Sequence, residues 1–341
     1  MRIMRRMLLV AGKEKYKFMC ETKHKEVAVS VICNTYNHGP YIKDALEGFV
    51  SQKTNFNYEV LIHDDASTDN TADIIREYER KYPELIKPIY QKENQYSKGV
   101  NITSTFHLPR LKGRYVALCE GDDYWTDSGK LQRQFDAMEA HPELDICAHT
   151  VSKVQASNSQ FLCNIAPSDK ETVFSTEEVI AGGGGFVATN SLFYRRELLE
   201  NQPEFLKYCP LDYSLQIHGA LRGGMLYLPD NMAIYRFLVA GSWTRRIENK
   251  EYADAQRYII KRMLDMVNEE TENRYASVIH KAKLQLDFMY YQNADDYKEL
   301  HTGELRNLYN EQPMSWKLKI YIKEHFPWLL KLYRKCMKEK Q

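Results

Sequence analysis

The chain of 341 residues lacks cysteines at the spacing that metal sites and disulfide frameworks use. Its seven cysteines are scattered without a C-x-x-C pair, and Cys33 and Cys119 lie inside apolar runs of strand length. This pattern is typical of reduced, buried thiols, and it argues against a zinc site or a secreted disulfide scaffold. We therefore expect a cytoplasmic protein.

Long apolar runs are absent as well. No stretch approaches the length of about 18 apolar residues that a membrane-spanning helix needs. The run Met7–Val10 is too short for the apolar core of a secretion signal, so we expect residues 1–25 to be a basic leader, disordered or peripheral to a membrane. Because 341 residues exceed one average domain, we expect a catalytic core with an appendage.

The chain has almost no net charge, +1 in total, but its charges are distributed unevenly. Residues 1–25 carry eight Lys or Arg against two Glu, and residues 313–341 carry the same numbers, so each end is +6 and the body between them −11. Basic ends around an acidic body favour an anionic surface as a partner for the ends, such as the inner face of the cell membrane. No nucleic-acid partner is expected.

What the chain does contain is a dense acidic turn behind a predicted strand. The apolar run Tyr115–Cys119 is followed by Glu120, Asp122 and Asp123 within four residues. Crowded carboxylates cost electrostatic free energy unless a cation or hydrogen-bond donors compensate. Oxygen ligands on a short turn suit Mg²⁺ or Mn²⁺, which keep waters and take phosphate oxygens. The alternative is a solvated acidic turn before a helix.

Apolar runs of strand length alternate with helical patterns ahead of this turn. The predicted strands cover 27–33, 58–63, 86–91 and 115–119. Helical spacing follows the first two of them, so the order is β-α-β-α-β, a longer connection, and β. This order predicts an α/β fold with a doubly wound, mostly parallel sheet, whose carboxyl strand ends are where ligands collect.

The turn at residues 64–71 admits three interpretations. A calcium loop counted from Asp65 would need Gly at its sixth position and Glu at its twelfth, but these hold Asn70 and Arg76. Helix capping accounts for three good N-terminal residues, Ser67, Thr68 and Asp69. Capping does not account for the carboxylates of Asp64 and Asp65 at the strand end. A carboxylate there could accept the imide N–H of a uracil, which lies between two carbonyls.

Three motifs together resemble the signatures of family 2 glycosyltransferases, nucleotide-sugar enzymes of the GT-A fold. They are V-S-V-I-C-N-T-Y-N at 29–37, D-D-A-S-T-D-N-T at 64–71 and E-G-D-D-Y-W at 120–125. The resemblance implies a nucleotide-sugar site at the strand ends, with the residues Thr35, Tyr36, Asn37, Asp64 and Asp65. Asp65 would hold the base. Asp122 would face the ribose or the sugar, and Asp123 would ligate the metal.

The segment Cys209–His218 resembles the acceptor-side helix of the same family, whose first-turn Asp, here Asp212, acts as general base. A sugar hydroxyl is a poor nucleophile, and a positioned carboxylate can take its proton as the new bond forms. Leu211 departs from the family pattern, which often has Gly or Glu there. The alternative is a carboxylate that favours the positive end of a helix, worth about 0.3–1 kcal/mol.

Residues 227–236 are predicted to form a strand, a turn and a second strand before a G-S-W run. Family members often carry Tyr-Arg and then Gly-Ser-Trp here, so the resemblance adds Arg236 and Trp243 to the nucleotide-sugar site. Arg236, Arg245 or Arg246 could neutralise the leaving diphosphate, or be surface arginines. Gly182–Gly185 is either a flexible connector or a loop whose backbone approaches the acceptor sugar.

The last part of the chain is predicted to be helical. Its basic end, 313–341, interleaves lysines with large apolar residues, Trp316, Ile320, Phe326, Trp328, Leu329 and Leu332. This composition is typical of interfacial helices, and the alternative is a terminal helix that packs on the core with its lysines outward. We divide the chain into the leader 1–25, a GT-A domain at 26–246 with nucleotide-binding half 26–125 and acceptor half 126–246, and a helical extension at 247–341.

The sequence as a whole predicts an inverting, metal-dependent glycosyltransferase. It would move a sugar from a nucleotide-diphosphate sugar, expected to be UDP-linked, to a hydroxyl of a glycan or lipid-linked saccharide in surface polysaccharide assembly. The expected cofactor is Mn²⁺ or Mg²⁺, and the expected location is the cytoplasm or the inner face of the cell membrane. Two alternatives stay open: a sugar-phosphate nucleotidyltransferase and a non-catalytic, membrane-docked sugar-nucleotide binding protein. The former needs a glycine-rich phosphate loop with Arg or Lys after the first strand, where this chain has N-T-Y-N-H-G.

Overall fold

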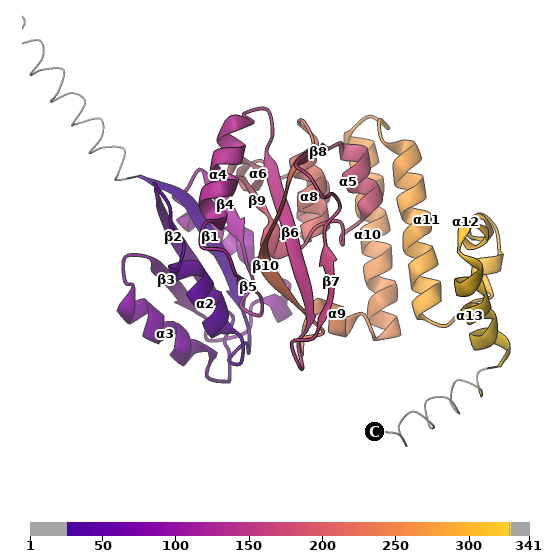
Figure 1. Ribbon diagram of the computed structural model, residues 1–341, viewed down its shortest axis with the longest axis horizontal. Helices are drawn as coiled ribbons and strands as arrows, with labels where there is room; N and C mark the ends of the chain where they lie inside the picture. Colours follow the sequence, from indigo (N-terminus) through magenta and orange to yellow (C-terminus); the bar gives the residue numbers. More distant parts are fainter. Residues whose placement is uncertain (1–25, 327, 329–341) are drawn as a thin grey trace, which may run out of the picture. The chain divides into compact units, whose positions relative to one another are not determined.

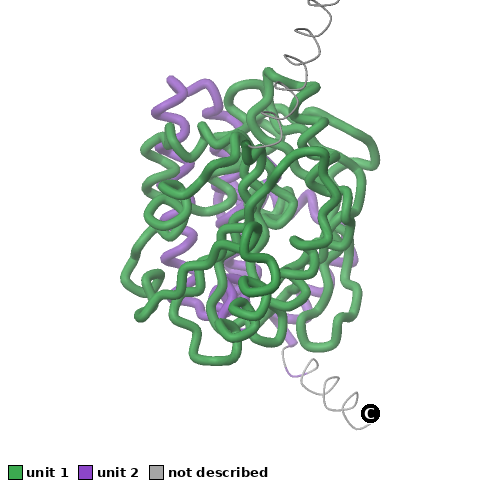
Figure 2. Tube along the Cα trace, turned by 90° about the vertical axis from the view of Figure 1, so that its left-hand side faces the viewer, with its two compact units in different colours: residues 1–179, 183–239 green, residues 180–182, 240–341 purple. Residues whose placement is uncertain are grey.

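The computed structural model of the chain describes residues 26–326 and residue 328. These residues divide into two compact units, shown in different colours in Figure 2. Unit 1 contains the described residues up to Val179 together with Gly183–Val239, and unit 2 contains Ile180–Gly182 and the described residues from Ala240 onward. The predicted leader lies outside the described residues, and so do residues 327 and 329–341 of the basic C-terminal end. The predicted domain boundary at 246 stays a prediction.

A ten-stranded sheet, counted over the described part of the chain, forms the centre of unit 1 (Figure 1). Its main path has the order β3-β2-β1-β4-β9-β6-β10-β5, with β7 paired to β6 and β8 paired to β10. The strands are β1 Val27–Thr35, β2 Asn57–Asp64, β3 Ile86–Tyr90, β4 Tyr115–Leu118, β5 Tyr124–Trp125, β6 Ile146–Gln155, β7 Phe161–Ile165, β8 Thr172–Phe174, β9 Phe193–Arg195 and β10 Met225–Phe237.

The first four strands are parallel to one another, which confirms the predicted α/β class with a mostly parallel sheet. Parallel strands are covered on both faces and are therefore mainly apolar, as the buried stretch Val29–Cys33 of β1 illustrates, in which only Ser30 is polar. In the other half of the sheet, β9 runs antiparallel between β4 and β6, and β10 runs parallel to β6. The first half therefore presents the carboxyl ends of β1, β2 and β4 at one edge.

The prediction of two strands separated by a turn at 227–236 is wrong, because β10 continues through this stretch. Its register against β6 shifts between Leu228 and Asn231 and again before Ala233. Pro229 has no backbone N–H to donate to a neighbouring strand, and such a position is accommodated by an irregularity in the ladder. The strand therefore reaches Arg236 without reversing direction.

Helices cover the sheet of unit 1 (Figure 1). They are α2 Ile42–Val50, α3 Thr71–Lys81, α4 Lys130–Ala140, α5 Thr176–Gly182, α6 Glu197–Glu200, α7 Glu204–Tyr208 and α8 Asp212–Ala220. Short helical turns occupy the connections, η1 Tyr96–Lys98, η2 Thr103–His107, η3 Leu108–Arg110 and η4 Thr189–Ser191. The apolar face of α2 is fully buried, including Ile42, Leu46 and Phe49.

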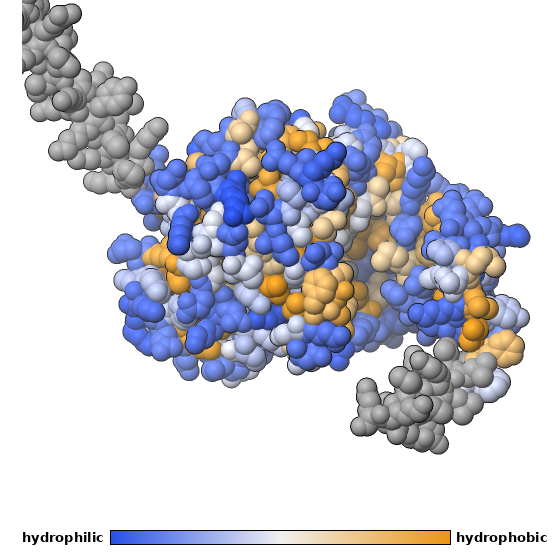
Figure 3. All heavy atoms as spheres, viewed as in Figure 1, coloured by the Kyte–Doolittle hydropathy of each residue, from blue (hydrophilic) through white to orange (hydrophobic). Residues whose placement is uncertain are grey.

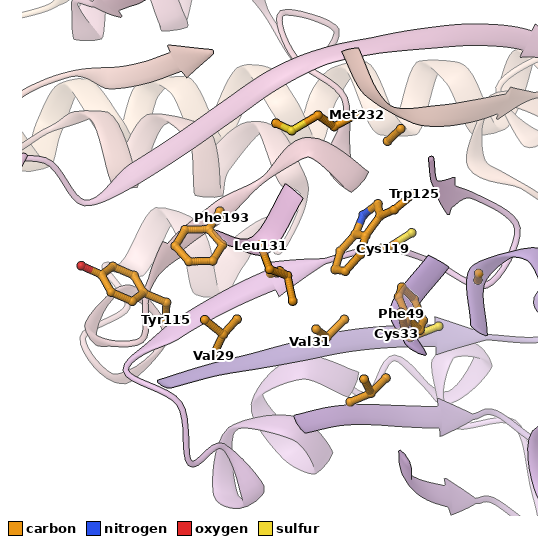
Figure 4. Packing of buried hydrophobic residues seen from close by; sticks show 14 of the residues in the cluster. Val29, Val31, Cys33, Phe49, Tyr115, Cys119, Trp125, Leu131, Phe193 and Met232 are labelled. Carbon is orange, nitrogen blue, oxygen red and sulfur yellow. The ribbon is translucent and has the colours of Figure 1, made fainter. Parts of the chain in front are cut away.

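The main hydrophobic core lies between the sheet and its helices, and Figure 4 shows part of it. The ring of Phe49 meets the edge of Trp125 with 5.0 Å between ring centroids. Full burial of such a side chain stabilises the fold by about 1.5–3 kcal/mol. Because Trp125 directly follows the acidic turn, this packing fixes the turn to helix α2.

Unit 2 is helical, as predicted. Its elements are α9 Trp243–Arg246, α10 Lys250–Glu270, α11 Ala276–Asn293, η5 Glu299–His301, α12 Leu305–Glu311 and α13 Met314–His325. Ion pairs join α10 to α11, with Asp287 accepting from Arg257 at 3.0 Å and from Lys261 at 2.7 Å. Phe288 and Ile320 belong to its separate core. Within the described residues, no helix combines the length and the apolarity needed to cross a membrane.

Candidate active site

The loops that follow β1, β2 and β4 are joined by backbone hydrogen bonds beyond the strands themselves. Thr35 is paired with Asp64 at the ends of β1 and β2, and the Asp65 N–H donates to the Thr35 carbonyl at 3.0 Å. On the other side, the Gly121 N–H donates to the Asn34 carbonyl at 2.9 Å. A Cβ at Gly121 would lie 2.6 Å from Thr35 Oγ1, so only glycine lets the acidic turn approach β1 this closely. The three predicted motifs therefore form one site.

The carboxylate of Asp65 holds a loop in place. Its Oδ1 accepts from the Gln95 N–H at 2.7 Å, and its Oδ2 accepts from the Tyr96 N–H at 3.0 Å. Each carboxylate oxygen has a second lone pair with which it can accept from a ligand. Tyr36 is 44% exposed and Tyr96 is 54% exposed, so both segments bonded to Asp65 carry partly exposed aromatic residues. Nothing in the motifs pointed to Gln95 or Tyr96, because their link to Asp65 runs through the backbone.

Asp64 and Thr35 are buried beneath this region. Neither Asp64 Oδ1 nor Thr35 Oγ1 has a hydrogen-bond partner among the described residues. Burial raises the pKa of the Asp64 carboxyl, and hydrogen bonds from Ser67 oppose that effect. Buried polar atoms without a partner are costly, and they gather where a ligand or water completes the site. The assignment of both residues to the nucleotide-sugar site stays a prediction.

Asn37 connects the loops after β1 and β2. Its backbone adopts the left-handed conformation with φ of 55°, its N–H donates to Ser67 Oγ at 2.9 Å, and its Oδ1 accepts from the Thr68 N–H at 2.8 Å. The N-cap of α3 is Asn70, which forms no side-chain cap bond. Asp69, one of the three residues predicted to cap this helix, lies just before it, and its Oδ1 accepts from the first N–H of α3, that of Thr71, at 2.9 Å. The motif residues therefore divide between holding the loops and lining the site.

The acidic turn carries two buried carboxylates and an exposed one. Asp122 and Asp123 are buried, whereas Glu120 is exposed. Burial first, and then the neighbouring charge of Asp122, raise the pKa of Asp123 well above its usual range. Two buried carboxylates side by side are unfavourable without a compensating cation, which agrees with the electrostatic cost expected from the sequence. His38 lies on the outer side, with its Nε2 3.9 Å from Asp122 Oδ2.

The residues of this turn suit a metal ion whose remaining coordination positions are filled by ligands from outside the protein. The described residues contain no group of three His, Cys, Asp or Glu side chains that could hold a metal by themselves. Mg²⁺ and Mn²⁺ bound with phosphates take only one or two carboxylates from the protein, and water and phosphate oxygens fill the remaining positions. Carboxylate oxygens at Asp122 and Asp123 fit this chemistry.

Arg236 reaches the acidic turn from the end of β10. Its backbone N–H donates to Asp123 Oδ1 at 2.8 Å, and its Nη1 donates to the Asp122 carbonyl at 2.9 Å. Its Nη2 donates to the carboxylate of Asp44 in the first turn of α2. The guanidinium is therefore engaged with protein groups on two sides.

Asp212 is the first residue of α8. Its Oδ2 accepts from Thr189 Oγ1 at 2.5 Å. Burial raises the pKa of the Asp212 carboxyl, while the Thr189 hydroxyl and the first N–H groups of the helix act to lower it. A Cβ at Gly184 would meet Tyr213 at 3.4 Å and Asp212 Oδ1 at 4.0 Å, so the glycine-rich loop passes close to this carboxylate. This position favours the interpretation of Gly182–Gly185 as a loop whose backbone approaches the acceptor sugar over its interpretation as a flexible connector.

A pocket of about 150 Å³ connects Asp212 with the acidic turn. Glu120 and Asp212 both line it, and its lining also contains amides and hydroxyls, those of Asn34, Asn101, Thr103, Thr189, Tyr194 and Gln202. Its lining contains no Lys or Arg. Asn101, Thr103, Thr189 and Gln202 were not predicted, because they come from connections without a motif. The pocket joins the two predicted halves of the site.

The remaining predicted residue, Trp243, begins helix α9 in unit 2. Arg245 of the same turn pairs with Glu248 at 3.0 Å. Their contribution to the site stays a prediction.

Comparison with known proteins extends these observations. The family model described as glycosyl transferase family 2 matches residues 30–201. An uncharacterized protein of Mycobacterium tuberculosis is 35% identical over 261 residues, covering 72% of this chain and 70% of that protein. The UDP-Glc:alpha-D-GlcNAc-diphosphoundecaprenol beta-1,3-glucosyltransferase WfaP of Escherichia coli is 38% identical over 111 residues, 33% of this chain and 41% of WfaP.

Solved structures share the fold at low identity. TarS of S. aureus in complex with UDP aligns with a TM-score of 0.53 and 18% identity, over 87% of this chain and 79% of the TarS chain. The mannosyltransferase PcManGT of Pyrobaculum calidifontis, in complex with GDP-Man and Mn²⁺, aligns with a TM-score of 0.53 and 14% identity, over 92% of this chain and 89% of that chain. These neighbours confirm the predicted GT-A fold class.

Proposed function

This chain belongs to glycosyl transferase family 2, and from that premise we propose that it is an inverting, metal-dependent enzyme that uses a UDP-sugar. The acceptor in this proposal is a hydroxyl of a glycan or a lipid-linked saccharide. The observation that carries it is that Glu120 of the acidic turn and Asp212 line the same pocket. A carboxylate beside the donor-binding turn can deprotonate an acceptor that approaches from the opposite side.

The relatives support the choice of substrates. The printed name of WfaP describes transfer of glucose from UDP-Glc to a GlcNAc diphosphoundecaprenol, a lipid-linked saccharide. TarS was crystallised with UDP and with UDP-GlcNAc, and PcManGT with GDP-Man and Mn²⁺. A UDP-linked donor, a divalent ion and a lipid-linked acceptor are thus all represented among proteins similar to this chain.

The donor would bind across the ends of β1, β2 and β4. The exposed ring of Tyr36 offers a surface on which a base can stack, and Asp65 offers a free lone pair for the imide N–H of a uracil. Asp123, with Asp122 beside it, would hold the divalent ion. When bound, that ion supplies positive charge against the negative charge that develops on the departing diphosphate.

Asp212 would take the proton of the attacking acceptor hydroxyl. The oxygen of that hydroxyl forms a bond to the anomeric carbon as the bond from this carbon to the diphosphate oxygen breaks, so a single displacement inverts the configuration. The raised pKa of Asp212 suits a base, since a carboxylate of ordinary pKa holds a proton weakly at neutral pH. A positioned base of this kind contributes about 10²–10⁴-fold to the rate.

Calorimetry on the full chain tests the metal-dependent part of this proposal. UDP binding is measured with Mn²⁺ and with a chelator, for the wild type, for Asp123→Ala and for Asp73→Ala, an exposed first-turn carboxylate of α3, as control. We expect tight binding only with Mn²⁺, and we expect Asp123→Ala alone to lose it. A screen of nucleotide sugars for slow release of nucleotide identifies the donor. Equal affinity for UDP with metal and with chelator would contradict the proposal.

A further inference from the structure

Arg236 occupies an unusual position for an arginine at a phosphate site. Its side chain is only 8% exposed, although it lies at the end of a strand beside the candidate active site. The centre of its guanidinium is 4.4 Å from the ring centroid of Tyr124 and 5.1 Å from that of Tyr41. Cation–π contacts of this kind hold the plane of the guanidinium. The side chain is therefore fixed by its surroundings before any ligand binds.

The same residue contacts the acidic turn at two points. The backbone N–H of Arg236 holds one oxygen of Asp123, and the guanidinium holds the carbonyl of Asp122. Antiparallel pairing of β10 with β5, which includes Ile234 opposite Tyr124, brings the end of β10 to this place. One residue thus holds the carboxylate of Asp123 and the backbone of Asp122.

Asp44 completes this arrangement from a different element. It lies in the first turn of α2, its side chain is 51% exposed, and it forms an ion pair with Arg236. We call Asp44 and Arg236 the Asp44–Arg236 pair.

We propose that Arg236 is a positioning residue, which together with Asp44 orients the acidic turn for the metal and does not bind the diphosphate. The inference rests on the proposed function, since it assigns a role within the same metal-dependent site. The guanidinium contacts Asp44 and the Asp122 carbonyl and lies beside two tyrosine rings. To reach a phosphate, it would have to give up these largely buried contacts, which is costly. Arg236 of the pair, by contrast, already holds the carboxylate of Asp123 and the backbone carbonyl of Asp122.

The two roles make opposite predictions for Asp44. If Arg236 binds the diphosphate, removal of Asp44 releases the guanidinium, and UDP binds as well as before or more tightly. If Arg236 acts through the turn, removal of Asp44 loosens Arg236 and weakens metal binding in the same way as removal of Arg236. Loss of residues that orient metal ligands typically costs about 10- to 100-fold in metal affinity.

The experiment compares Asp44→Ala, Arg236→Met and the double variant in the full chain. Mn²⁺ binding is followed by the paramagnetic resonance signal of free Mn²⁺, with and without UDP, and thermal unfolding checks the fold. Asp73→Ala is the matched control, because Asp73 is also a first-turn carboxylate paired with an arginine, Arg76 at 2.8 Å, but on α3. Arg236→Lys tests whether charge without the planar group suffices.

We expect each single variant to weaken Mn²⁺ binding by about 10- to 100-fold, and the double variant to be no weaker than Arg236→Met, because residues of one unit are not additive. The control should match the wild type. Wild-type Mn²⁺ affinity in Asp44→Ala, with UDP binding lost only in Arg236→Met, would overturn the inference and leave the proposed function standing. A wild type that binds neither Mn²⁺ nor UDP would overturn both.

Discussion

At the scale of single residues, the side chain of Asp212 is where the chemistry can be tested most directly. It sits in the first turn of α8, where a carboxylate is favourable, yet its Oδ2 is bonded to Thr189 at 2.5 Å and it lines the pocket shared with Glu120. A carboxylate kept only for the helix end would not need a hydroxyl partner from a different connection. This contact favours a role in the reaction.

Asp212→Asn should leave the unfolding temperature almost unchanged while it lowers transfer by about 10²–10⁴-fold, the usual contribution of a general base. An amide keeps the size and the helix-end preference of the carboxylate but takes no proton at neutral pH. Donor binding, measured by calorimetry with UDP and Mn²⁺, should survive. Transfer close to that of the wild type would return Asp212 to the role of a helix-end carboxylate.

The hydroxyl of Thr189 should set the pH dependence of the same step. A base works only when deprotonated, so activity falls as the pH drops through its pKa, and burial moves that fall above the ordinary range of an aspartate. The Thr189 hydroxyl acts to lower the pKa, so Thr189→Val should move the acid limb to still higher pH, whereas Thr189→Ser keeps the hydroxyl and the limb. The pH profile of kcat/KM measures this. An acid limb at the same pH in Thr189→Val would show that the limb belongs to another group.

At the scale of elements, the apolar strands were predictable and their partners were not. The predicted strands 27–33, 58–63, 86–91 and 115–119 agree with β1 to β4 within two residues at each end, because strands buried on both faces are mainly apolar. The insertion of β9 between β4 and β6, and the two-residue strand β5, depend on contacts distant in the sequence. No local pattern encodes such pairings.

The residues of the candidate site also fall into those that the sequence predicts and those that it does not. Motif residues such as Asp65 and Asp123 were predictable, because their carboxylates have a chemistry of their own. Their partners were not, since Gln95, Tyr96 and Arg236 contact them through backbone N–H groups, which every residue but proline possesses. Sequence reasoning therefore finds the groups that act on a ligand more readily than the groups that hold them in place.

Helix α4 contains a buried cation that its sequence pattern did not predict. Its apolar residues Leu131 and Met138 are buried, and Lys130 at the start of the helix is fully buried as well. Its Nζ donates to Gln134 Oε1 at 2.7 Å and lies 4.0 Å from the ring centroid of Trp125. Burial lowers the pKa of Lys130 to about 7, and the nearby thiols Cys119 and Cys147 oppose that effect.

This lysine should make the stability of unit 1 depend on pH. Between about pH 7 and its unfolded value near 10.4, the unfolded chain binds a proton that the folded chain does not, so stability rises with pH. From pH 7 to pH 9, this contribution is about 1–3 kcal/mol. The free energy of unfolding, measured with urea, should not show this increase with pH in Lys130→Met. The variant Lys53→Met, at an exposed position, should show the same increase as the wild type. Equal pH dependence of wild type and Lys130→Met would show that Lys130 stays charged in the fold.

At the scale of the whole molecule, the described part of the basic C-terminal end both packs on unit 2 and carries exposed apolar side chains. In α13, Ile320 is buried in the core of unit 2, and Trp316 stacks on Phe288 with 5.7 Å between ring centroids. On other positions of the same helix, Met314, Leu318 and Tyr321 are exposed large apolar residues. Figure 3 shows apolar surface gathered along this helix. The helix is therefore attached to its unit and still presents apolar side chains to the outside.

An exposed apolar set on a chain end with a charge of +6 suits a membrane that carries anionic lipids. Lys319 lies exposed beside Leu318, and further basic residues follow in 331–341. Each basic residue near an anionic surface contributes about 1 kcal/mol, and inserted apolar side chains add to this. We therefore propose peripheral attachment through this end, where a lipid-linked acceptor would be found.

Truncation at residue 312 would test this attachment poorly, because it also removes Ile320 and Trp316 from the core of unit 2. The double variant Leu318→Ser with Tyr321→Ser spares that core. We expect the wild type to sediment with vesicles that contain anionic lipid at low salt, and the double variant to bind several-fold less, with Tyr258→Ser, 71% exposed on α10, as the matched control. High salt should release the wild type, since the Debye length falls to about 3 Å at 1 M. If the wild type stays in the supernatant, or binds neutral vesicles equally well, α13 serves only the packing of unit 2.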